Sequence, residues 1–573
     1  MKKYDLNFTT GGFLLVLLLF FGAFLFYPVS FMLKGAFFAE RTFSLKYFAL
    51  LVESPLLRES LLNSVSIAFL TTLLTTLLTL PLAHWMTRFS FRGKTMLSGL
   101  LLVPMIMPPF VGAIGLSQLL ARYGSLNLLL MKLHLIATDK PIDWLGQGSF
   151  WGIVFLQVLN LYPILFLNVS AAMANVDPSL RESAQNLGAR GWRLFRTITL
   201  PLILPGYFAG AVIVFIWAFT DLGTPLIFGF SRVVPVQIFD AVNEINTNPM
   251  GYALVVFVLV LTLALFLVSK QALAGRRYEM MARGHTAGAE VSATARQTFG
   301  IWLVLSAVIG LALLPHLTVI LHSVARNWFF SVLPVKWTVG NYGEIFGHGL
   351  TLSSIRNSLF YSSLSALLDL GLGLIIAWLL TRRKIPLAGL LDALAMLPLA
   401  LPGLVLAFGY VAGFDFDDKK HPVLNQLLDP RENPTLLLIV SYSVRRLPYI
   451  VRSAYAGFQQ TSVTLEEASA NVGASPFRTL CRITIPLVMA NLIAGTVLTF
   501  SFAMLEVSDS LILAMREQHF PITKMIWLLM GRVDPNAPGV ACALGVVGMG
   551  ILTASLLVAG KVLGTRMGQL FRA

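Results

Sequence analysis

Long, nearly uninterrupted runs of apolar residues dominate the pattern of this 573-residue chain. Each run has about 20 residues, the length that a helix needs to cross the hydrocarbon core of a bilayer. The runs are too long for strands and do not alternate between apolar and polar positions. The pattern therefore predicts an all-α polytopic membrane protein with about twelve transmembrane helices. The predicted spans are 13–33, 61–82, 97–121, 150–174, 201–220, 251–269, 299–323, 355–380, 388–412, 434–457, 486–510 and 538–560.

Composition agrees with a membrane protein. Hydrophobic residues make up 56% of the chain and charged residues only 12%, whereas about 25% of residues are charged in soluble domains. Mean hydropathy is +0.77. The net charge of +15 could suggest a nucleic-acid ligand, but the basic residues stand in short segments between the apolar runs. We therefore expect a lipid bilayer as a partner and no nucleic acid.

The segments between the runs differ in their content of Lys and Arg. The segment before span 1, every second loop after it and the segment after span 12 together contain more basic residues than the alternate loops. Basic residues collect on the cytoplasmic side of membrane proteins, so the pattern predicts that both termini are cytoplasmic. The strongest basic clusters follow the same alternation: Arg382, Arg383 and Lys384, and Arg276, Arg277 and Arg283.

The chain also repeats itself. Five residues near spans 2 and 3 recur at one constant offset: Ala83, Thr87, Arg88, Pro104 and Pro108 correspond to Ala377, Thr381, Arg382, Pro398 and Pro402. Three later residues recur at a slightly shorter offset: Pro163, Gly188 and Pro201 correspond to Pro448, Gly473 and Pro486. Copies with an even number of spans are parallel in topology, unlike inverted repeats. We expect two parallel tandem six-helix repeats, 1–269 and 299–573, joined by a cytoplasmic linker at 270–298 with no fold of its own.

One loop motif occurs once in each copy. After span 4 the chain reads Glu182-Ser183-Ala184, three residues, Gly188, nine residues, and Ile198-Thr199-Leu200-Pro201. After span 10 it reads Glu467-Ala468-Ser469, three residues, Gly473, nine residues, and Ile483-Thr484-Ile485-Pro486. The motif resembles the EAA loop of binding-protein-dependent ABC importer permeases, Glu-Ala-Ala-x3-Gly-x9-Ile-x-Leu-Pro. It departs from that pattern only at Ser183, Ser469 and Ile485. A single copy would be read as an ordinary amphipathic turn, but two copies in register favour the motif.

The resemblance covers both halves, and is strongest to fused two-domain permeases of the ferric-iron, phosphonate and thiamine type. It implies a type I importer fold in the bacterial inner membrane, a periplasmic solute-binding protein, and two copies of a separate ABC ATPase subunit. The solute would be ferric iron or a small anion such as a phosphonate. The EAA loops at about 177–201 and 462–486 would couple the permease to the ATPase. The coupling residues implied are Glu182, Ala184, Gly188, Ile198, Pro201, Glu467, Ala468, Gly473, Ile483 and Pro486.

Enzymatic motifs are not recognisable in the sequence. Gly93-Lys94-Thr95 ends like a phosphate-binding loop, but Arg88 stands where that loop needs its first glycine, and no strand precedes it. We therefore expect no catalytic residue, metal site or cofactor in this chain, and expect ATP and magnesium to be bound by the partner ATPase. The alternative is a secondary active transporter, which would need an ion-coupling site on broken helices and no docking loops.

Ionisable residues within spans are costly, so they are candidates for a translocation path. Asp221 and Glu506 occupy matching positions near the ends of spans 5 and 11, with Asp509 nearby. Arg445 and Arg446 lie within span 10, where the first copy has Asn160 and Leu161. These six polar residues, Asn160 included, would line a path or gate. The alternative is structural: the arginines pair with carboxylates between helices, and Asp221 and Glu506 cap helix ends.

Overall fold

The computed structural model describes residues 8–39, 42–106, 108–245, 247–274, 290–415 and 422–563. The first copy contains α1 (Phe8–Phe21), α2 (Tyr27–Phe37), α3 (Lys46–Glu53), α4 (Pro55–Arg88), α5 (Lys94–Leu100), α6 (Pro109–Leu120), α7 (Ser125–Lys132), α8 (Phe150–Ala174), α9 (Pro178–Asn186), α10 (Gly191–Leu194), α11 (Leu200–Thr220), α12 (Gly223–Ile227), α13 (Val234–Ala241) and α14 (Met250–Ala274). The second contains α15 (Ala295–Ser323), α16 (Gly340–Gly347), α17 (Gly349–Arg382), α18 (Ala388–Met396), α19 (Gly403–Gly413), α20 (Pro422–Leu428), α21 (Thr435–Gln460), α22 (Val463–Asn471), α23 (Pro476–Thr479), α24 (Ile485–Met504), α25 (Ser508–Leu513), α26 (Ile522–Met530) and α27 (Ala537–Leu563). The all-α polytopic fold is confirmed.

Nine helical segments within the described residues are long and apolar enough to cross a membrane, and two bent helix pairs raise that number to eleven. These eleven coincide with eleven of the predicted spans. The remaining predicted span is α21, a helix of 26 residues. Every 18-residue stretch of α21 contains Arg445, Arg446 and Arg452, whereas each of the other eleven spans has an 18-residue stretch with at most two charged residues.

Prolines account for the two bent spans. The pair in the first copy turns by 97° between Lys94–Ile106 and Phe110–Lys132, and the pair in the second turns by 101° between Ala388–Leu399 and Gly403–Gly413. Pro108 and Pro402 stand directly at the two breaks. Because proline cannot donate a backbone hydrogen bond, the helix opens there. The similar angles give the two copies the same local shape.

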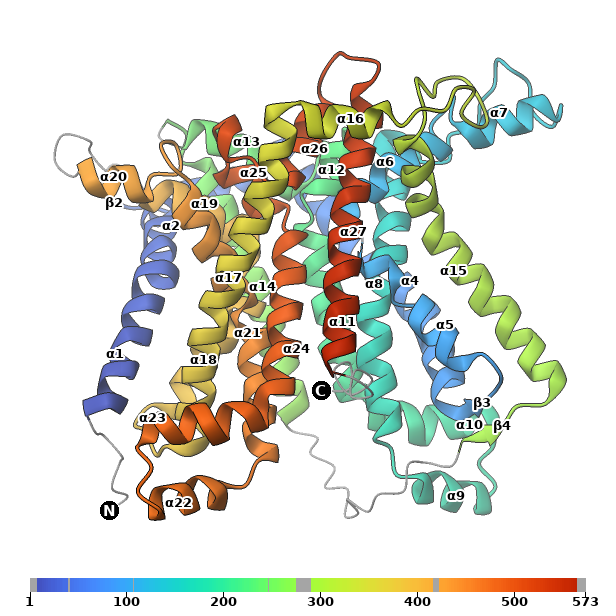
Figure 1. The fold of residues 1–573 in the computed structure, drawn as a ribbon. Helices are drawn as coiled ribbons and strands as arrows, with labels where there is room; N and C mark the ends of the chain where they lie inside the picture. Colours follow the sequence, from blue (N-terminus) through green and yellow to red (C-terminus); the bar gives the residue numbers. More distant parts are fainter. Residues whose placement is uncertain are drawn as a thin grey trace.

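Each copy is built around a three-helix bundle, α4 with α8 and α11 in the first, and α17 with α21 and α24 in the second. Figure 1 shows the two bundles side by side. Matching contacts hold the same turn in both copies. The Ser64 hydroxyl accepts a hydrogen bond from the Val234 amide at 2.8 Å. The Ser358 hydroxyl accepts one from the Ile522 amide at 2.7 Å. The internal repeat is therefore a repeat of packing as well as of sequence.

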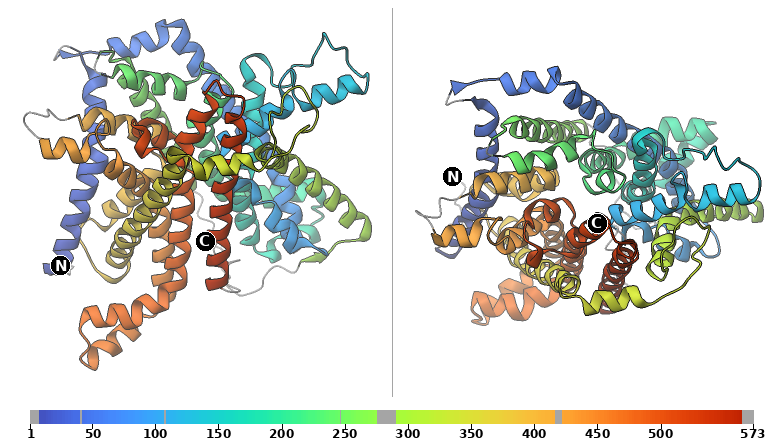
Figure 2. Two further views of the ribbon diagram at one scale, coloured as in Figure 1. Left: turned by 45° about the horizontal axis from the view of Figure 1, so that its top comes forward. Right: turned by 90° about the horizontal axis from the view of Figure 1, so that it is seen from above.

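The first helices of the two copies are exchanged. Helix α2 packs on α14 of its own copy and on α19 of the second, while α15 packs on α27 of its own copy and on α6 of the first. Figure 2 shows the blue α1–α2 segment beside the orange second-copy helices, and yellow-green α15 beside the blue helices of the first copy. Corresponding glycines, Gly409 in α19 and Gly115 in α6, allow the close approach, because an added Cβ would press on Pro28 and on Pro315 respectively.

The linker is partly structured, which corrects the expectation of a tether without a fold. Strand β4 (Val291–Ser292) pairs in parallel with β3 (Phe89–Ser90), beside an ion pair of 2.7 Å between Lys94 and Glu290. Helix α15 then begins at Ala295 behind a capping box formed by Thr294 and Gln297. A second small sheet pairs β1 (Phe38–Ala39) with β2 (Thr42–Phe43). Residues 275–289, with the basic cluster Arg276, Arg277 and Arg283, lie outside the described residues.

Candidate functional site

The first of the two motif loops, residues 177–201, folds into two short helices joined by a left-handed glycine. We call both loops EAA loops after the motif that they resemble. Asp177 caps α9 by accepting a hydrogen bond of 2.9 Å from the Ser179 amide. The helix ends at Gly188, whose φ is +88°, and the Ala189 amide bonds back to the Ala184 carbonyl at 2.9 Å. This is the closing pattern of a helix that ends on a left-handed residue. Helix α10 and a π-helix at Phe195–Thr199, which contains Ile198, lead directly into α11.

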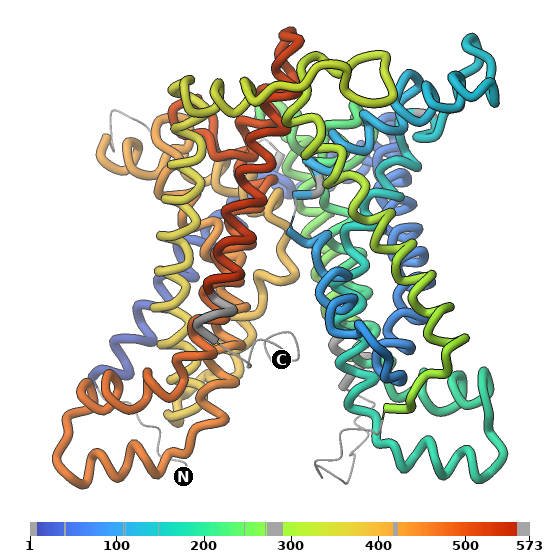
Figure 3. The backbone as a smooth tube through the Cα atoms, turned by 45° about the vertical axis from the view of Figure 1, so that its right-hand side comes forward, coloured from blue at the N-terminus to red at the C-terminus, as the bar shows by residue number. Residues whose placement is uncertain are grey.

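The second EAA loop has the same construction. Ser462 caps α22, and Gly473 ends it with a φ of +82°. The Ala474 amide bonds back to the Ser469 carbonyl at 3.1 Å. Helix α23 and a π-helix at Leu480–Thr484, which contains Ile483, then lead into α24. Figure 3 shows both loops projecting from the same end of the molecule, well apart from each other.

Neither loop glycine is crowded by its own chain. An added Cβ at Gly188 or Gly473 would meet no atom within 4 Å. The permease itself therefore leaves room for a Cβ at both positions, and the constraint that it places on them is the positive φ. Glu182, Glu467 and Ala468 are exposed, whereas Ala184 is buried against the loop. Pro201 and Pro486 each stand in the first turn of the following spanning helix.

Exposed apolar side chains stand at matching positions on both loops. Leu187 and Val472, directly before the two glycines, are 88% and 85% exposed, and Trp192 and Phe477 are 70% and 75% exposed. Leu180 and Leu465 complete the set. We call these six residues the docking face. Exposed apolar side chains that gather on one surface mark a site of interaction with another protein or with a membrane. These six residues were not predicted from the sequence, although the repeat register aligns all three pairs.

A cluster of buried charges lies within the second copy. Arg445 in α21 forms an ion pair of 2.5 Å with Glu506 and one of 3.3 Å with Asp509. The next residue, Arg446, also pairs with Glu506. Glu506 and Asp509 sit at the junction of α24 and α25, and both carboxylates are almost fully buried. The cluster thus balances two guanidinium groups against two carboxylates between neighbouring helices.

Polar neighbours complete the charge cluster. The Ser441 hydroxyl donates a hydrogen bond of 2.9 Å to Asp509, and the Ser443 hydroxyl donates one of 2.5 Å to Asp369 in α17. Asp369, Ser441 and Ser443 were not among the path residues predicted from the sequence. A signal was available, because Ser441 precedes Arg445 by one helical turn and therefore shares its face.

The charge cluster opens onto a cavity between the two copies. The cavity has a volume of about 150 Å³, and its lining includes Asn160, Asp221, Arg445, Arg446 and Glu506. Five of the six predicted path residues are thereby brought together, and Asp509 touches the cluster from behind. On the first-copy side, Gln157 donates a hydrogen bond of 3.2 Å to Asp221. Gln157 is a further residue that the sequence analysis missed.

The contacts agree with the structural interpretation of these residues, and the translocation path stays a prediction. The arginines pair with carboxylates between helices, and Asp221 accepts a hydrogen bond of 3.1 Å from the Gly223 amide at the start of α12. The same side chains line the cavity. A group that is paired on one side and faces a cavity on the other can hold the fold together and also contact a polar solute.

Gly403 makes room for the charge cluster. A Cβ at this position, directly after the proline break of the second bent span, would collide with the Arg445 guanidinium and the Asp509 carboxylate. We expect Gly403→Ala to lower the free energy of unfolding by about 1–3 kcal/mol, as overpacking does, and to reduce uptake. Thermal unfolding of the purified permease measures the first effect and solute uptake the second.

Gly371→Ala in α17 is the matched control for that variant. An added Cβ at Gly371 would meet no atom within 4 Å. Alanine is also the better helix former, so we expect this control to be neutral or slightly stabilising. Equal stabilities for the two variants would contradict the role given to Gly403.

Comparison with known families gives one match that occurs twice. The family of binding-protein-dependent transport system inner membrane components matches residues 76–278 and 369–567. These two segments make up more than half of the chain and fall one in each copy. Each contains one EAA loop. The match therefore follows the internal repeat.

Individual relatives match either nearly the whole chain or a part of it. A ferric transport system permease protein of Actinobacillus pleuropneumoniae is 26% identical, over 97% of this chain and 79% of its own length. A molybdenum transport system permease protein of Haemophilus influenzae is 28% identical, over 39% of this chain and 96% of its own length. A solved bacterial ABC transporter for the import of the polysaccharide alginate matches 46% of this chain and 94% of its own, with 20% identity and a TM-score of 0.38.

Proposed function

Because the chain belongs to the family of binding-protein-dependent transport system inner membrane components, in its fused two-domain form, we propose that two separate ATPase subunits drive it through its two EAA loops. The chain is an importer permease in a membrane. The observation that carries the proposal is the matched docking face, with exposed apolar residues at the same positions of both loops. Two loops of the same shape offer two places for the same partner.

The proposal fixes a stoichiometry. Native mass spectrometry of the complex purified from membranes should give one copy of this chain with two identical ATPase subunits. The reason is that α9 and α22, with the glycine turns behind them, present equivalent surfaces. A complex with a single ATPase subunit would contradict this stoichiometry. A permease that transports without any ATPase would favour the secondary transporter instead.

The proposal also fixes an orientation. The EAA loops would face the cytoplasm, where ATP is available, and the opposite end of the molecule in Figure 1 would receive solute from a periplasmic binding protein. The basic clusters support this orientation. Reporter fusions after residue 285 and at the C-terminus should read as cytoplasmic, and fusions near 135 and 420 as periplasmic. A periplasmic reading at 285 would exclude the parallel arrangement.

Ferric iron is the solute that we propose. The support is the similarity to a ferric transport system permease protein, which extends over 97% of this chain. The relatives described above lend no support to a phosphonate. Uptake of radiolabelled ferric iron by cells that express this permease with its binding protein and ATPase tests the proposal. Transport of a different solute by the same three components would exclude iron and leave the importer intact.

A further inference from the structure

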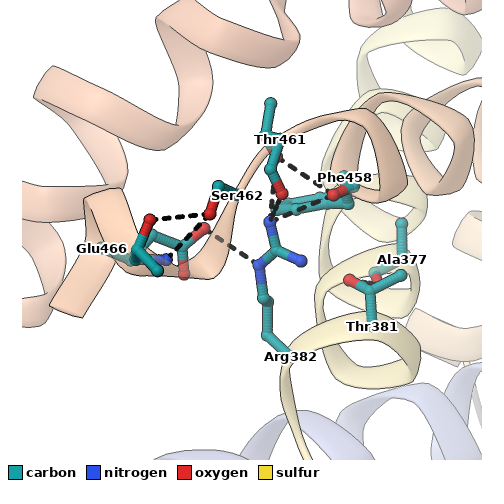
Figure 4. Close-up of polar contacts among 8 residues, drawn as sticks. Ala377, Thr381, Arg382, Phe458, Thr461, Ser462 and Glu466 are labelled. Carbon is teal, nitrogen blue, oxygen red and sulfur yellow. Dashed lines mark hydrogen bonds and ion pairs between the residues drawn. The ribbon is translucent and has the colours of Figure 1, made fainter.

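One arginine ties the second EAA loop to two spanning helices. Arg382 is the last residue of α17, and its Nε pairs with the Glu466 carboxylate of α22 at 3.0 Å. Its Nη2 donates hydrogen bonds of 3.1 Å to the Phe458 carbonyl of α21 and 3.0 Å to the Thr461 carbonyl. A third bond, of 2.9 Å, reaches the Thr461 hydroxyl. Figure 4 shows the guanidinium between these groups.

The same guanidinium lies over the Phe458 ring, 5.3 Å from its centre. The side chain of Arg382 is only 7% exposed and that of Glu466 19%. Water therefore competes poorly for these bonds, and a planar guanidinium holds several partners in one fixed geometry. We call Arg382 with Phe458, Thr461 and Glu466 the latch. It joins the ends of α17 and α21 to the first turn of α22.

The first copy has the arginine and lacks its partners. Arg88 corresponds to Arg382 and is likewise the last residue of its helix, α4. The positions of Phe458, Thr461 and Glu466 are occupied there by Met173, Val176 and Arg181. The ring, the hydroxyl and the carboxylate are all replaced.

Charge separates the two copies most clearly. In the second copy opposite charges meet at the loop, whereas in the first Arg88 faces Arg181. Burial and the positive charge of Arg88 together lower the pKa of Arg181. Within the described residues, Arg88 makes no ion pair, and its recorded partner is the ring of Phe89 at 5.6 Å. Arg88 and Arg181 therefore repel each other in the first copy, whereas Arg382 and Glu466 attract each other in the second.

The latch lies in the second copy, and so does the charge cluster. Helix α21 carries Arg445 and Arg446 at the cavity and Phe458 at the latch. Helix α17 packs along α21 more extensively than any other helix in the second copy. A displacement of α22 would therefore reach the cavity through a continuous, bonded path. The first EAA loop also touches its own α4, through the rings of His84 and Phe195. Within the described residues, however, no recorded ion pair or hydrogen bond joins α9 to α4, as Arg382 joins α22 to α17.

We propose that Arg382 is a positioning residue for coupling, which makes the second EAA loop, and not the first, move as one body with its spanning helices. The two loops then present equivalent docking faces and differ in how they pass motion on. This inference rests on the proposed coupling to an ATPase. It adds that the two halves of the permease are mechanically unequal.

Distances between spin labels test the inference without any knowledge of the solute. One label pair is placed at Asn471 and Leu367 in the second copy, and the corresponding pair at Asn186 and Leu73 in the first. All four side chains are exposed. The exposed Cys481 is first replaced by serine, while Cys542 is buried and is kept. Distances are measured in the complete complex with its ATPase, with and without ATP and magnesium.

In the second copy we expect a narrow distribution of label distances whose mean stays the same when nucleotide binds. In the first copy we expect a distance distribution that is broader or shifts with nucleotide. Arg382→Gln or Glu466→Gln should make the second copy behave like the first. Arg181→Glu should narrow the first, because it creates the missing pair with Arg88. Arg88→Gln is the matched control and should change neither. Equal widths in the two wild-type copies, or an unchanged second copy in Arg382→Gln, would overturn the inference.

A coupling measurement separates positioning from simple stability. In proteoliposomes, the number of ATP molecules hydrolysed per labelled ferric ion delivered should rise at least about fivefold in Arg382→Gln, the lower end of typical coupling effects. Retention of the ATPase should stay normal. An unchanged ratio in this variant would contradict the inference. A wild-type complex that retains no ATPase would instead refute the proposed function before any variant is compared.

Discussion

Replacing Glu506 by glutamine should destabilise the folded permease and stop uptake. Glu506 is the shared partner of Arg445 and Arg446, and its side chain is 5% exposed. Glutamine keeps the shape and removes the charge, so that of the ion pairs recorded for the two arginines only the one between Arg445 and Asp509 is left. Breaking a buried ion pair in this way costs about 3–5 kcal/mol. Thermal unfolding of the purified permease and solute uptake in cells measure the two effects.

The repeat provides a matched control for that experiment. Asp221 holds the corresponding position in the first copy, and it accepts hydrogen bonds from Gln157 and the Gly223 amide. Because no ion pair is recorded for Asp221 within the described residues, Asp221→Asn should cost only about 1 kcal/mol, the usual value of a hydrogen bond. If both variants lost the same stability, the charge pairing would not be the reason.

Replacing both loop glycines by aspartate should abolish uptake while the permease still reaches the membrane. Gly188 and Gly473 have φ values of +88° and +82°. A non-glycine residue in that conformation costs on the order of 1 kcal/mol. An added Cβ meets no atom of the described residues within 4 Å, so the larger effect should come from the ATPase side, where the side chain would project beside the docking face. Membrane level, ATPase retention and uptake are measured together.

The double alanine variant separates strain from obstruction. Alanine carries the backbone strain without the bulk or charge of aspartate, so it should retain more ATPase and more uptake. Normal uptake in the double aspartate variant, at normal membrane level, would exclude these loops as the coupling elements. Equal loss in both double variants would assign the effect to the backbone conformation rather than to docking.

Local signals in the sequence predicted most of the fold. Apolar runs located the spans, and the internal repeat predicted the division into two similar copies. The charge cluster was half found, because Arg445 and Glu506 are conspicuous in apolar surroundings. Gln157 and Ser443 are not conspicuous, since uncharged polar residues are common in spanning helices. Their roles depend on which helices face each other.

Other features depend on contacts between distant segments. The exchange of α2 and α15 leaves no trace in spacing or hydropathy, because lipid-facing and helix-facing apolar residues look alike. In the sequence, the latch is visible only as a difference between matching positions of the two copies, Arg181 in the first and Glu466 in the second. It acquires meaning only when α17, α21 and α22 are seen to meet at Arg382. The structured end of the linker likewise depends on β3, which lies some 200 residues earlier in the chain than β4.

The exchanged helices also set the order in which the chain can be completed. The packing surface for α2 includes α19, which the ribosome produces only after the whole first copy and a third of the second. Until α19 has been made, the surface of α2 that packs on it has no protein partner. Because the two copies are one chain, each α2 is synthesised together with the α19 on which it packs. Two severed halves would therefore reach the packing of α2 on α19, and of α15 on α6, only by associating with each other.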